Sequence, residues 1–468
     1  MSESEGESER SVGQERQKRS INLKGQKESK LENVGILDKI KRLTNTEDKK
    51  RLLSNFVSLS VLQGANYILP LITLPYLVRV LGPERYGLIS FAQAFIQYFN
   101  ILTDYGFNLS ATREVSIYRD DKEKVSEIFS SVMIIKFGLL ILSFIIMTVL
   151  VFSFGKFRQD WLIYFLTFGM VVGQVLFPVW FFQGMERMKY ITYLNITARL
   201  IFTVAIFVFI HQASDYIYVP FLNFMGSLLA GALSLWIVFR NFNVNFKLPS
   251  MADIKHQLRE GWYIFISTMA ISLYTTSNTF ILGLFTNNTI VGYYSGAEKI
   301  IKAIQGLLSP VSQAIYPHIS KLASGSKEKA IKFIRKIALL VGGASFILSL
   351  VVFIFADIIV KLLLGNQYQE SIVVLRILAF IPFIVALTNM FGAQLLLPFN
   401  IKRLFTLSII IPSVLHIVLL FFAASIFREI GVSIVAVFTE SLILVFRMSG
   451  LYLFHKDLFL GLVHYGER

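Results

Sequence analysis

Long apolar segments recur along the chain and are separated by short polar loops. A run of about 20 apolar residues is long enough to cross the hydrocarbon core of a bilayer as a helix. Pro and Gly interrupt several segments, which membrane helices tolerate where neighbouring groups satisfy the freed carbonyls. The pattern predicts an all-α integral membrane protein with twelve transmembrane helices, near residues 56–78, 86–111, 128–152, 161–183, 191–211, 216–239, 261–284, 291–316, 333–355, 372–396, 404–427 and 431–454.

Composition agrees with a membrane protein. Of the 468 residues, 54% are hydrophobic and only 16% are charged, against about 25% charged in an average soluble domain. The net charge of +15 could indicate nucleic-acid binding, but the basic residues lie in the loops between apolar runs, where they orient membrane helices. The absence of cysteine excludes disulfides and thiolate metal sites. We expect no cofactor, no metal and no nucleic-acid partner.

Polar stretches divide the chain into five parts. Residues 1–51 are polar and poor in aromatics, which predicts a disordered cytoplasmic tail. Within it, Leu31–Asn45 has apolar residues at spacings of three, typical of an interfacial amphipathic helix or of a solvated lead-in to the first span. The remaining parts are a six-helix bundle over 52–240, a cytoplasmic linker over 241–260, a second six-helix bundle over 261–454 and a cytoplasmic tail over 455–468.

Lys and Arg alternate between the loops in a way that predicts orientation. The even-numbered loops hold 18 of these residues and the odd-numbered loops hold 6. Loops rich in Lys and Arg stay in the cytoplasm, so both termini are expected there.

A weak internal repeat relates the two bundles by an offset of 205 positions. It pairs Gly87 with Gly292 and Ser90 with Ser295, and it repeats a Lys-Glu-Lys run at residues 122–124 and 327–329. Because each half has an even number of spans, the halves are parallel repeats related by a pseudo-twofold axis along the membrane normal. This arrangement suits a transporter in which two bundles rock around a cavity.

Both halves carry a polar stripe on one face of an equivalent helix. Such a stripe has to face protein or water, either as interhelical hydrogen bonds or as the wall of a cavity. The stripe of the second span comprises Gln93, Gln97, Asn100, Asp104 and Asn108, and that of the eighth span comprises Glu298, Lys302, Gln305, Ser309 and Gln313.

Ionisable residues at membrane depth are further candidates for a cavity. Glu298 and Lys302 can pair at i,i+4, which leaves Lys299 as a surplus cation. Lys136 and Arg447 lie near helix ends and are expected to extend to the interface, whereas Glu440 is deep enough to pair across helices. The cavity candidates are Lys299, Lys302, Arg199, Arg376, Asp104 and Glu298, together with Gln93, Gln97, Asn100 and Gln305.

Cations outnumber carboxylates among these candidates, which favours an anionic, phosphate-bearing substrate. An exporter of organic cations is expected to show the opposite balance.

Several short motifs resemble one family of transporters. GPERYG (Gly82–Gly87), LTDYGF (Leu102–Phe107), ATREVS (Ala111–Ser116), FFQGMERMKY (Phe181–Tyr190), GYYSGAEKI (Gly292–Ile300) and YPHIS (Tyr316–Ser320) occur in order within the twelve-span frame. Over about residues 52–454 the chain resembles the Wzx-type O-antigen and capsule flippases of the multidrug/oligosaccharidyl-lipid/polysaccharide superfamily.

The resemblance implies an alternating-access flippase, not an enzyme, in the bacterial cytoplasmic membrane. Its implied substrate is an undecaprenyl-pyrophosphate-linked oligosaccharide, and its implied partners are membrane lipids and the polysaccharide polymerase machinery. By motif match, Arg113 takes the place of a cytoplasmic gate or headgroup contact, and Glu298 and Lys299 are family-like cavity positions.

Two other functions remain open at this point. A multidrug or cation-coupled exporter would share the frame and would use Asp104, Glu298 or Glu440 as its carboxylates. A membrane glycosyltransferase or polymerase would need a large outer loop or a catalytic cluster, whereas the odd-numbered loops here are short and poor in His and carboxylates.

Overall fold

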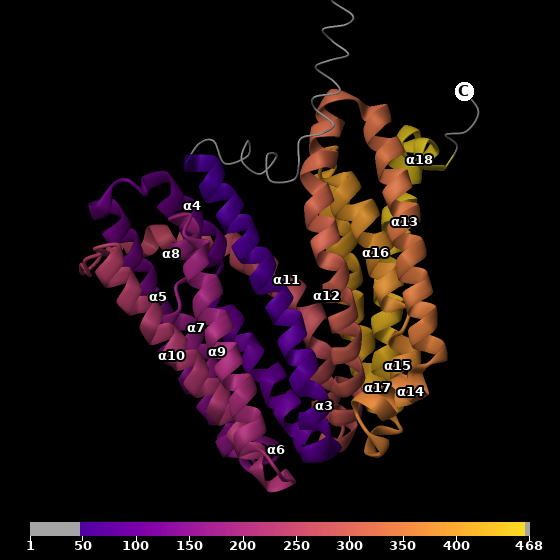
Figure 1. Cartoon of the computed structure of the whole chain (residues 1–468), viewed down its shortest axis with the longest axis horizontal. Coiled ribbons are helices and arrows are strands. Elements are labelled where there is room, and N and C mark those ends of the chain that lie inside the picture. The colour runs from indigo at the N-terminus through magenta and orange to yellow at the C-terminus, as the bar shows by residue number, and fades with distance from the viewer. Residues whose placement is uncertain (1–46, 464–468) are drawn as a thin grey trace, which may run out of the picture. The chain divides into compact units, whose positions relative to one another are not determined.

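The computed structural model describes residues 47–463, and these form helices and short connections without a β-strand among them (Figure 1). The predicted disordered tail and the amphipathic segment Leu31–Asn45 lie outside the described residues, apart from the tail's last residues, 47–51, which are helical. Contacts divide the chain into two units, Met1–Ser58 and Leu59–Arg468, and the second unit is described below by itself.

The described residues of the first half form nine helical elements. They are α3 (Glu47–Asp104), α4 (Phe107–Tyr118), α5 (Lys122–Ser153), α6 (Gly155–Arg158), α7 (Trp161–Leu176), α8 (Val179–Gly184), α9 (Met188–Phe209), the 3₁₀ helix η1 (Ala213–Ile217) and α10 (Tyr218–Asn241).

The second half follows after an extended linker. Its elements are α11 (Met251–Phe285), α12 (Asn288–Gly325), α13 (Lys327–Ile354), α14 (Ala356–Leu363), η2 (Asn366–Tyr368), α15 (Ser371–Leu378), α16 (Ile381–Phe391), the π-helical turn η3 (Gly392–Leu396), α17 (Lys402–Phe454) and α18 (Lys456–Val463).

Eight stretches of described residues are long and apolar enough to cross a membrane, which confirms the expected class of an all-helical membrane protein. Two of these stretches have a kink with non-helical backbone angles inside one long helix, at Gly82 in α3 (φ 71°) and at Arg428 in α17 (φ 54°). The helices α11 and α12 are 35 and 38 residues long but more polar. The count of twelve spans stays a prediction.

Two expected boundaries shift. Helix α11 begins at Met251, so its first turns replace half of the expected linker 241–260. Ser250 caps this helix, and its hydroxyl donates a 2.6 Å hydrogen bond to Asp253 that lowers the pKa of that carboxyl. The expected tail 455–468 contains helix α18, whose Leu458 and Leu462 are buried with Ile331. Polar residues flank the apolar stripes of both helices, so neither the expected linker nor the expected tail contains the long apolar run that predicts a membrane helix.

Proline interrupts corresponding helices of the two halves. Pro178 stands between α7 and α8, and Pro382 lies in the first turn of α16 after the short α15. Proline cannot donate a backbone hydrogen bond and its ring clashes with the preceding turn, so the helix breaks at both places.

The largest buried cluster of side chains joins the two halves. It contains Leu88 and Phe91 from α3 together with Leu282 from α11 and Val291 and Tyr294 from α12. The Phe91 ring stacks on Phe280 with a centroid distance of 5.7 Å. The contact between halves is therefore a packed apolar surface and not a hinge loop alone.

Helices α3 and α12 meet through two glycines that the repeat offset pairs with each other. A Cβ atom added to Gly87 would lie 1.8 Å from the Asn288 carbonyl oxygen, and one added to Gly292 would lie 2.0 Å from that of Pro83. Asn288 and Pro83 are themselves related by the offset of 205. Such a reciprocal contact is what a twofold axis passing between the two glycines produces.

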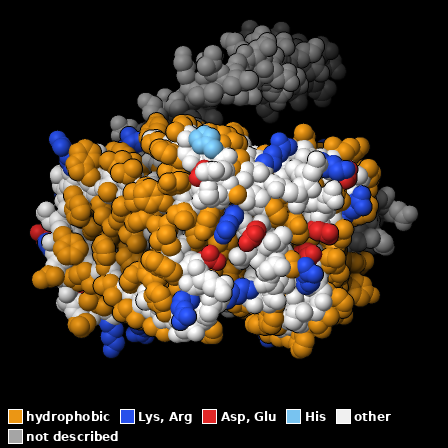
Figure 2. Space-filling view, turned by 90° about the horizontal axis from the view of Figure 1, so that it is seen from below, with side chains coloured by type: hydrophobic (Ala, Val, Ile, Leu, Met, Phe, Trp, Pro, Cys, Tyr) orange, Lys and Arg blue, Asp and Glu red, His pale blue; other side chains and the backbone are white. Residues whose placement is uncertain are grey.

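Close to the glycine contact, Gln367 of η2 donates hydrogen bonds to the carbonyls of Val78 and Arg79 in α3. The end of the unit that carries α6 and α14 is at the bottom of Figure 1. Figure 2 looks onto this end and shows Lys, Arg, Asp and Glu side chains gathered toward its middle, with hydrophobic side chains prominent around them. Charged residues here include Lys156, Arg158, Asp357 and Lys361. A polar centre with an apolar surround is expected where a membrane protein emerges into water.

We predict that alanine at either glycine of the contact destabilises the protein. Gly87→Ala and Gly292→Ala each add a methyl group where backbone atoms leave no space, and overpacking costs about 1–3 kcal/mol. Gly138→Ala in α5 is the matched control, because a Cβ atom there has no neighbour within 4 Å. Thermal unfolding in detergent should show a lower Tm for the first two variants and an unchanged or higher Tm for the control. Equal Tm values for all three would contradict the close approach.

Candidate functional site

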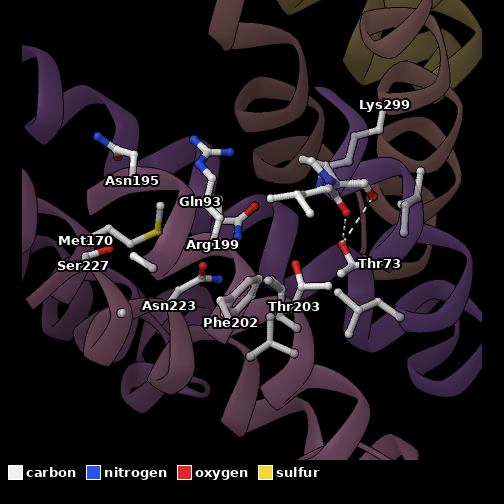
Figure 3. Close-up of a pocket in the computed structure, with 18 of the residues that line it drawn as sticks. Thr73, Gln93, Met170, Asn195, Arg199, Phe202, Thr203, Asn223, Ser227 and Lys299 are labelled. Carbon is white, nitrogen blue, oxygen red and sulfur yellow. Dashed lines mark hydrogen bonds between the residues drawn. The ribbon is translucent and has the colours of Figure 1, made fainter. Parts of the chain in front are cut away.

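A pocket of about 430 Å³ lies mainly within the first half of the chain (Figure 3). We call it the first-half pocket. Its wall is built from α3, α7, α9 and α10, and a single residue of the second half, Lys299 of α12, completes it. Its polar lining residues are Thr73, Gln93, Asn195, Arg199, Thr203, Asn223, Ser227 and Lys299.

The first-half pocket is cationic. Arg199 and Lys299 both line it, and no Asp or Glu is among its lining residues. The Lys299 ammonium lies 5.0 Å from the centroid of the Tyr86 ring, a cation–π contact that holds the side chain toward the pocket. Two cations without a lining carboxylate leave the pocket short of negative charge, which an anionic ligand would supply.

Neutral hydrogen-bonding groups surround these two cations. Gln93 comes from α3, Asn195 from α9, and Asn223 with Ser227 from α10, and Figure 3 shows them around Arg199. Asn223 and Ser227 are spaced i,i+4, so both face the same side of α10. Amide and hydroxyl groups can each donate and accept, as recognition of sugar hydroxyls requires.

A second pocket of about 140 Å³ lies within the second half. We call it the second-half pocket. Its polar and ionisable lining residues are Tyr274, Thr275, Asn278, Tyr294, Glu298, Lys302, Gln305, His416, Thr439 and Glu440.

The second-half pocket contains an ion pair on α12. Lys302 Nζ lies 3.0 Å from Glu298 Oε1, and the exposed fractions of the two side chains are 54% and 14%. A helical i,i+4 pair of this kind contributes about 0.2–0.5 kcal/mol in water. The structure therefore contains the ion pair that was predicted for Glu298 and Lys302, and Glu298 neutralises the charge of Lys302.

Buried polar groups of the second-half pocket bond to one another. His416 donates from Nε2 to Asn278 Oδ1 at 3.0 Å, and its Nδ1 shares a 2.8 Å hydrogen bond with Thr439 Oγ1. Both ring nitrogens therefore have a partner, and the imidazole links α11 to both segments of α17. Among the described residues, no group of three His, Asp or Glu side chains could hold a metal ion.

Helix α12 divides the predicted stripe between the two pockets. Glu298, Lys302 and Gln305 line the second-half pocket, whereas Lys299, one residue round the helix from Glu298, lines the first-half pocket. Successive helical residues differ by about 100° in direction, so neighbours in sequence can serve different cavities.

The stripe of the second span reaches a pocket only at Gln93. Gln97 accepts a 3.2 Å hydrogen bond from Asn100, and Asp104 accepts one of 2.6 Å from Asn108. None of these four residues lines either pocket. The first bond lies within α3, and the second joins the last residue of α3 to the start of α4.

Two predicted cations lie elsewhere. Arg376 is exposed on α15, and Arg113 is exposed on α4. Neither lines the first-half or the second-half pocket.

The expectation that Lys136 and Arg447 extend to the membrane interface is wrong. Their exposed fractions are 1% and 4%. Arg447 donates to Ser408 at 2.9 Å and to the Thr388 carbonyl at 2.5 Å, and the charge of Lys136 interacts with that of Asp104. Both cations are packed inside the bundle beside polar groups, so neither side chain has to extend to water.

Sequence inspection missed part of both pockets. Asn195, Asn223 and Ser227 were not singled out, although polar residues at i,i+4 in an apolar span were a usable signal. His416 has no partner at metal-ligand spacing in the sequence, and the structure gives it Asn278 and Thr439 as partners from other segments. Only the fold brings these residues together.

Comparisons with known proteins identify the family of this chain. The family described as polysaccharide biosynthesis protein matches residues 52–323. The chain is 36% identical over 399 residues to a putative O-antigen transporter of Escherichia coli (strain K12), covering 85% of the chain and 95% of that relative. That relative is named as a transporter, in line with the expectation of a protein that is not an enzyme.

Two solved structures share the fold. The lipid II flippase MurJ in an inward closed conformation matches with a TM-score of 0.60 at 12% identity, covering 88% of this chain and 90% of that one. An inward-facing multidrug resistance transporter of the MATE family matches with a TM-score of 0.57 at 16% identity, covering 86% and 98%. A flippase and a drug transporter thus have the same fold, so the fold does not distinguish between these two functions.

The family assignment rests on the share of the chain that each match covers as well as on sequence identity. It confirms the resemblance drawn from the sequence motifs. Because the family match covers more than half of the chain and the relative 36% identical spans most of it, the chain belongs to the polysaccharide biosynthesis protein family.

Proposed function

We propose that the protein moves lipid-linked oligosaccharides across a membrane by alternating access. The observation that carries this proposal is the first-half pocket, where Arg199 and Lys299 face a cavity without a lining carboxylate. A lipid-linked sugar whose carrier ends in phosphate offers the negative charge that this pocket is short of. The relative named an O-antigen transporter supports the same class of cargo.

In finer terms, we propose an undecaprenyl-pyrophosphate-linked repeat unit as the substrate. Arginine binds phosphate oxygens in a bidentate manner, and lysine adds a mobile point charge. Arg199 and Lys299 would share the pyrophosphate, while Gln93, Asn195 and Asn223 would hydrogen-bond the sugar hydroxyls. The polyprenyl chain would stay in the lipid, outside the pocket.

We further propose twelve spans in two parallel six-helix halves, with their pseudo-twofold axis passing between Gly87 and Gly292. The reciprocal contact of these glycines supports this arrangement, as do the breaks at Pro178 and Pro382. The loop charges support a place for the glycine contact on the outer side of the membrane. Opening to the outside would then require α3 and α12 to separate at the two glycines.

The proposed location is the bacterial cytoplasmic membrane with both termini in the cytoplasm. The excess of Lys and Arg in the even-numbered loops supports this orientation. A flippase of repeat units would deliver its product to polysaccharide polymerase machinery on the outer side, which makes that machinery a proposed partner.

One observation favours the alternative of a cation-coupled exporter. The second-half pocket contains Glu298 and Glu440 beside the polar network of His416. In a flippase, the pair of Glu298 with Lys302 would be structural or would contact the sugar. In an exporter, the carboxylates would be essential while Arg199 would not.

We predict that the loops holding Asp120 and Gly325 face the same side of the membrane. Both residues are exposed and are related by the repeat offset. In this naturally cysteine-free chain, Asp120→Cys and Gly325→Cys should resist a membrane-impermeant maleimide in intact cells and react after lysis. Ser214→Cys, in the exposed turn η1, should react in intact cells and serves as the outer control. Protection of only one of the first two sites would rule out parallel halves.

We predict that charge in the first-half pocket is required for transport. Arg199→Gln and Lys299→Gln should each lower surface polysaccharide at least about tenfold, because a hydrogen bond to a charged group contributes about 1.5–3 kcal/mol. Arg376→Gln is the matched control, since it removes an exposed cation that lines neither pocket. With membrane levels equalised, full polysaccharide in the Arg199 and Lys299 variants would refute the substrate assignment.

A double substitution separates the two roles of Lys302. We predict that Lys302→Ala abolishes or strongly reduces surface polysaccharide, while Lys302→Arg retains part of it. If Lys302 binds substrate, Glu298→Gln combined with Lys302→Gln should insert normally and still fail to transport. If Lys302 only neutralises Glu298, the double variant should restore function because no charge is left unpaired. Restoration would reduce Lys302 to a structural partner.

A further inference from the structure

A groove of about 510 Å³ lies on the outside of the second half, where the end of α12 meets the first turns of α13. Four of its lining residues are cations, Lys329, Lys332, Arg335 and Lys336, and none is acidic. None of its lining residues lines the first-half or the second-half pocket. It is therefore a separate site from the proposed transport cavity.

The cations gather on one side of α13 because of their spacing. Lys329, Lys332 and Lys336 recur at three and four residues, so they share one face of the helix, and all three are exposed. Like charges at this spacing destabilise a helix by a few tenths of a kcal/mol per pair. A bound anion would reverse the sign of that effect.

The rest of the groove is apolar. Leu322, Phe333 and Leu339 complete its wall, and the Phe333 ring lies against that of His318 at a centroid distance of 4.7 Å. Leu339 and Leu340 are 69% and 63% exposed and continue the apolar surface along α13. A cationic end that runs into an apolar surface matches an amphiphile with an anionic headgroup.

The equivalent face of the first half lacks the cluster of cations. The repeat offset places Lys124, Glu127, Ser130 and Ser131 at the positions of the four cations. Lys124 pairs with Glu127 at 3.0 Å, and Ser130 accepts a 3.0 Å hydrogen bond from the backbone of Lys247 in the linker. The cationic groove is therefore a feature of one half and does not follow from the repeat architecture.

We infer that this groove binds the headgroup of an anionic phospholipid of the surrounding bilayer, with the phosphate at Lys329 and Lys336 and an acyl chain along Phe333 and Leu339. A bilayer phospholipid is favoured over the lipid-linked substrate because the groove shares no residue with the transport pockets. The inference requires that α13 spans the membrane and goes beyond the proposed transport function, to a lipid that regulates or anchors this half.

The test is lipid binding to the purified full chain by native mass spectrometry. Phosphatidylglycerol and phosphatidylcholine with identical acyl chains are titrated in parallel, so that only the headgroup charge differs. The wild type should bind phosphatidylglycerol preferentially. Lys329→Gln with Lys336→Gln should weaken that binding about thirtyfold, at about 1 kcal/mol for each cation near a membrane surface. Lys329→Arg with Lys336→Arg should keep it, which shows that the groove still folds.

A matched control distinguishes the groove from general electrostatics. Lys402→Gln with Arg403→Gln removes the same charge from exposed positions of α17 that do not line the groove. This variant should bind phosphatidylglycerol as the wild type does. Equal weakening in both double variants, or equal binding of the two lipids by the wild type, would overturn the inference.

Two further competition measurements distinguish a bilayer phospholipid from the carrier lipid and from a free phosphate. Undecaprenyl pyrophosphate that displaced phosphatidylglycerol at an equal or lower concentration would assign the groove to the carrier lipid and contradict the inference. Glycerol phosphate should not compete, because it lacks the acyl chain. The lipid result does not depend on polysaccharide export, so failure here leaves the transport proposal standing, and the reverse also holds.

Discussion

A charge in a membrane has to find a partner or water, and the arrangement of this protein follows from that constraint. An ionisable side chain at the centre of a bilayer costs at least about 2.5–3.5 kcal/mol when it is unpaired. Arg447 meets the constraint through Ser408 and the Thr388 carbonyl, and Lys302 meets it through Glu298. Arg199 and Lys299 instead face a pocket without a lining carboxylate. The proposed function depends on Arg199 and Lys299, the two cations that line this pocket.

The glycine contact places that cavity between two helices that can separate. Gly87 and Gly292 bring the backbones of α3 and α12 together at one end of the unit, while Lys299, two turns further along α12, already belongs to the wall of the first-half pocket. Separation there would also part the apolar surface that joins the two halves, which includes Phe91, Leu282 and Tyr294. In the proposed cycle, separation at the glycines would open the pocket on the side that is closed here.

The sequence predicted the class of fold, the internal repeat and the cationic character of the site. These depend on local properties, namely apolar length, loop charge and residue type at equivalent positions. Gln93, Arg199 and Lys299 were predicted and lie together. The stripe residues Gln97, Asn100 and Asp104 line neither pocket. Helical spacing predicts which residues share one face of a helix, but it does not predict what packs against that face. Similarly, burial of Lys136 and Arg447 depends on packing between distant helices, and proximity to a helix end misled the expectation of an interfacial position.

Reconstituted transport tests the central claim most directly. The purified protein is placed in proteoliposomes containing a fluorescent undecaprenyl-pyrophosphate-linked oligosaccharide, and the leaflet that holds the sugar is read by a membrane-impermeant quencher or lectin. Parallel vesicles contain a fluorescent organic cation instead of the lipid-linked sugar. The account predicts protein-dependent movement of the lipid-linked sugar between leaflets and no movement of the cation. Movement of the cation without movement of the lipid-linked sugar would contradict it and would identify an exporter.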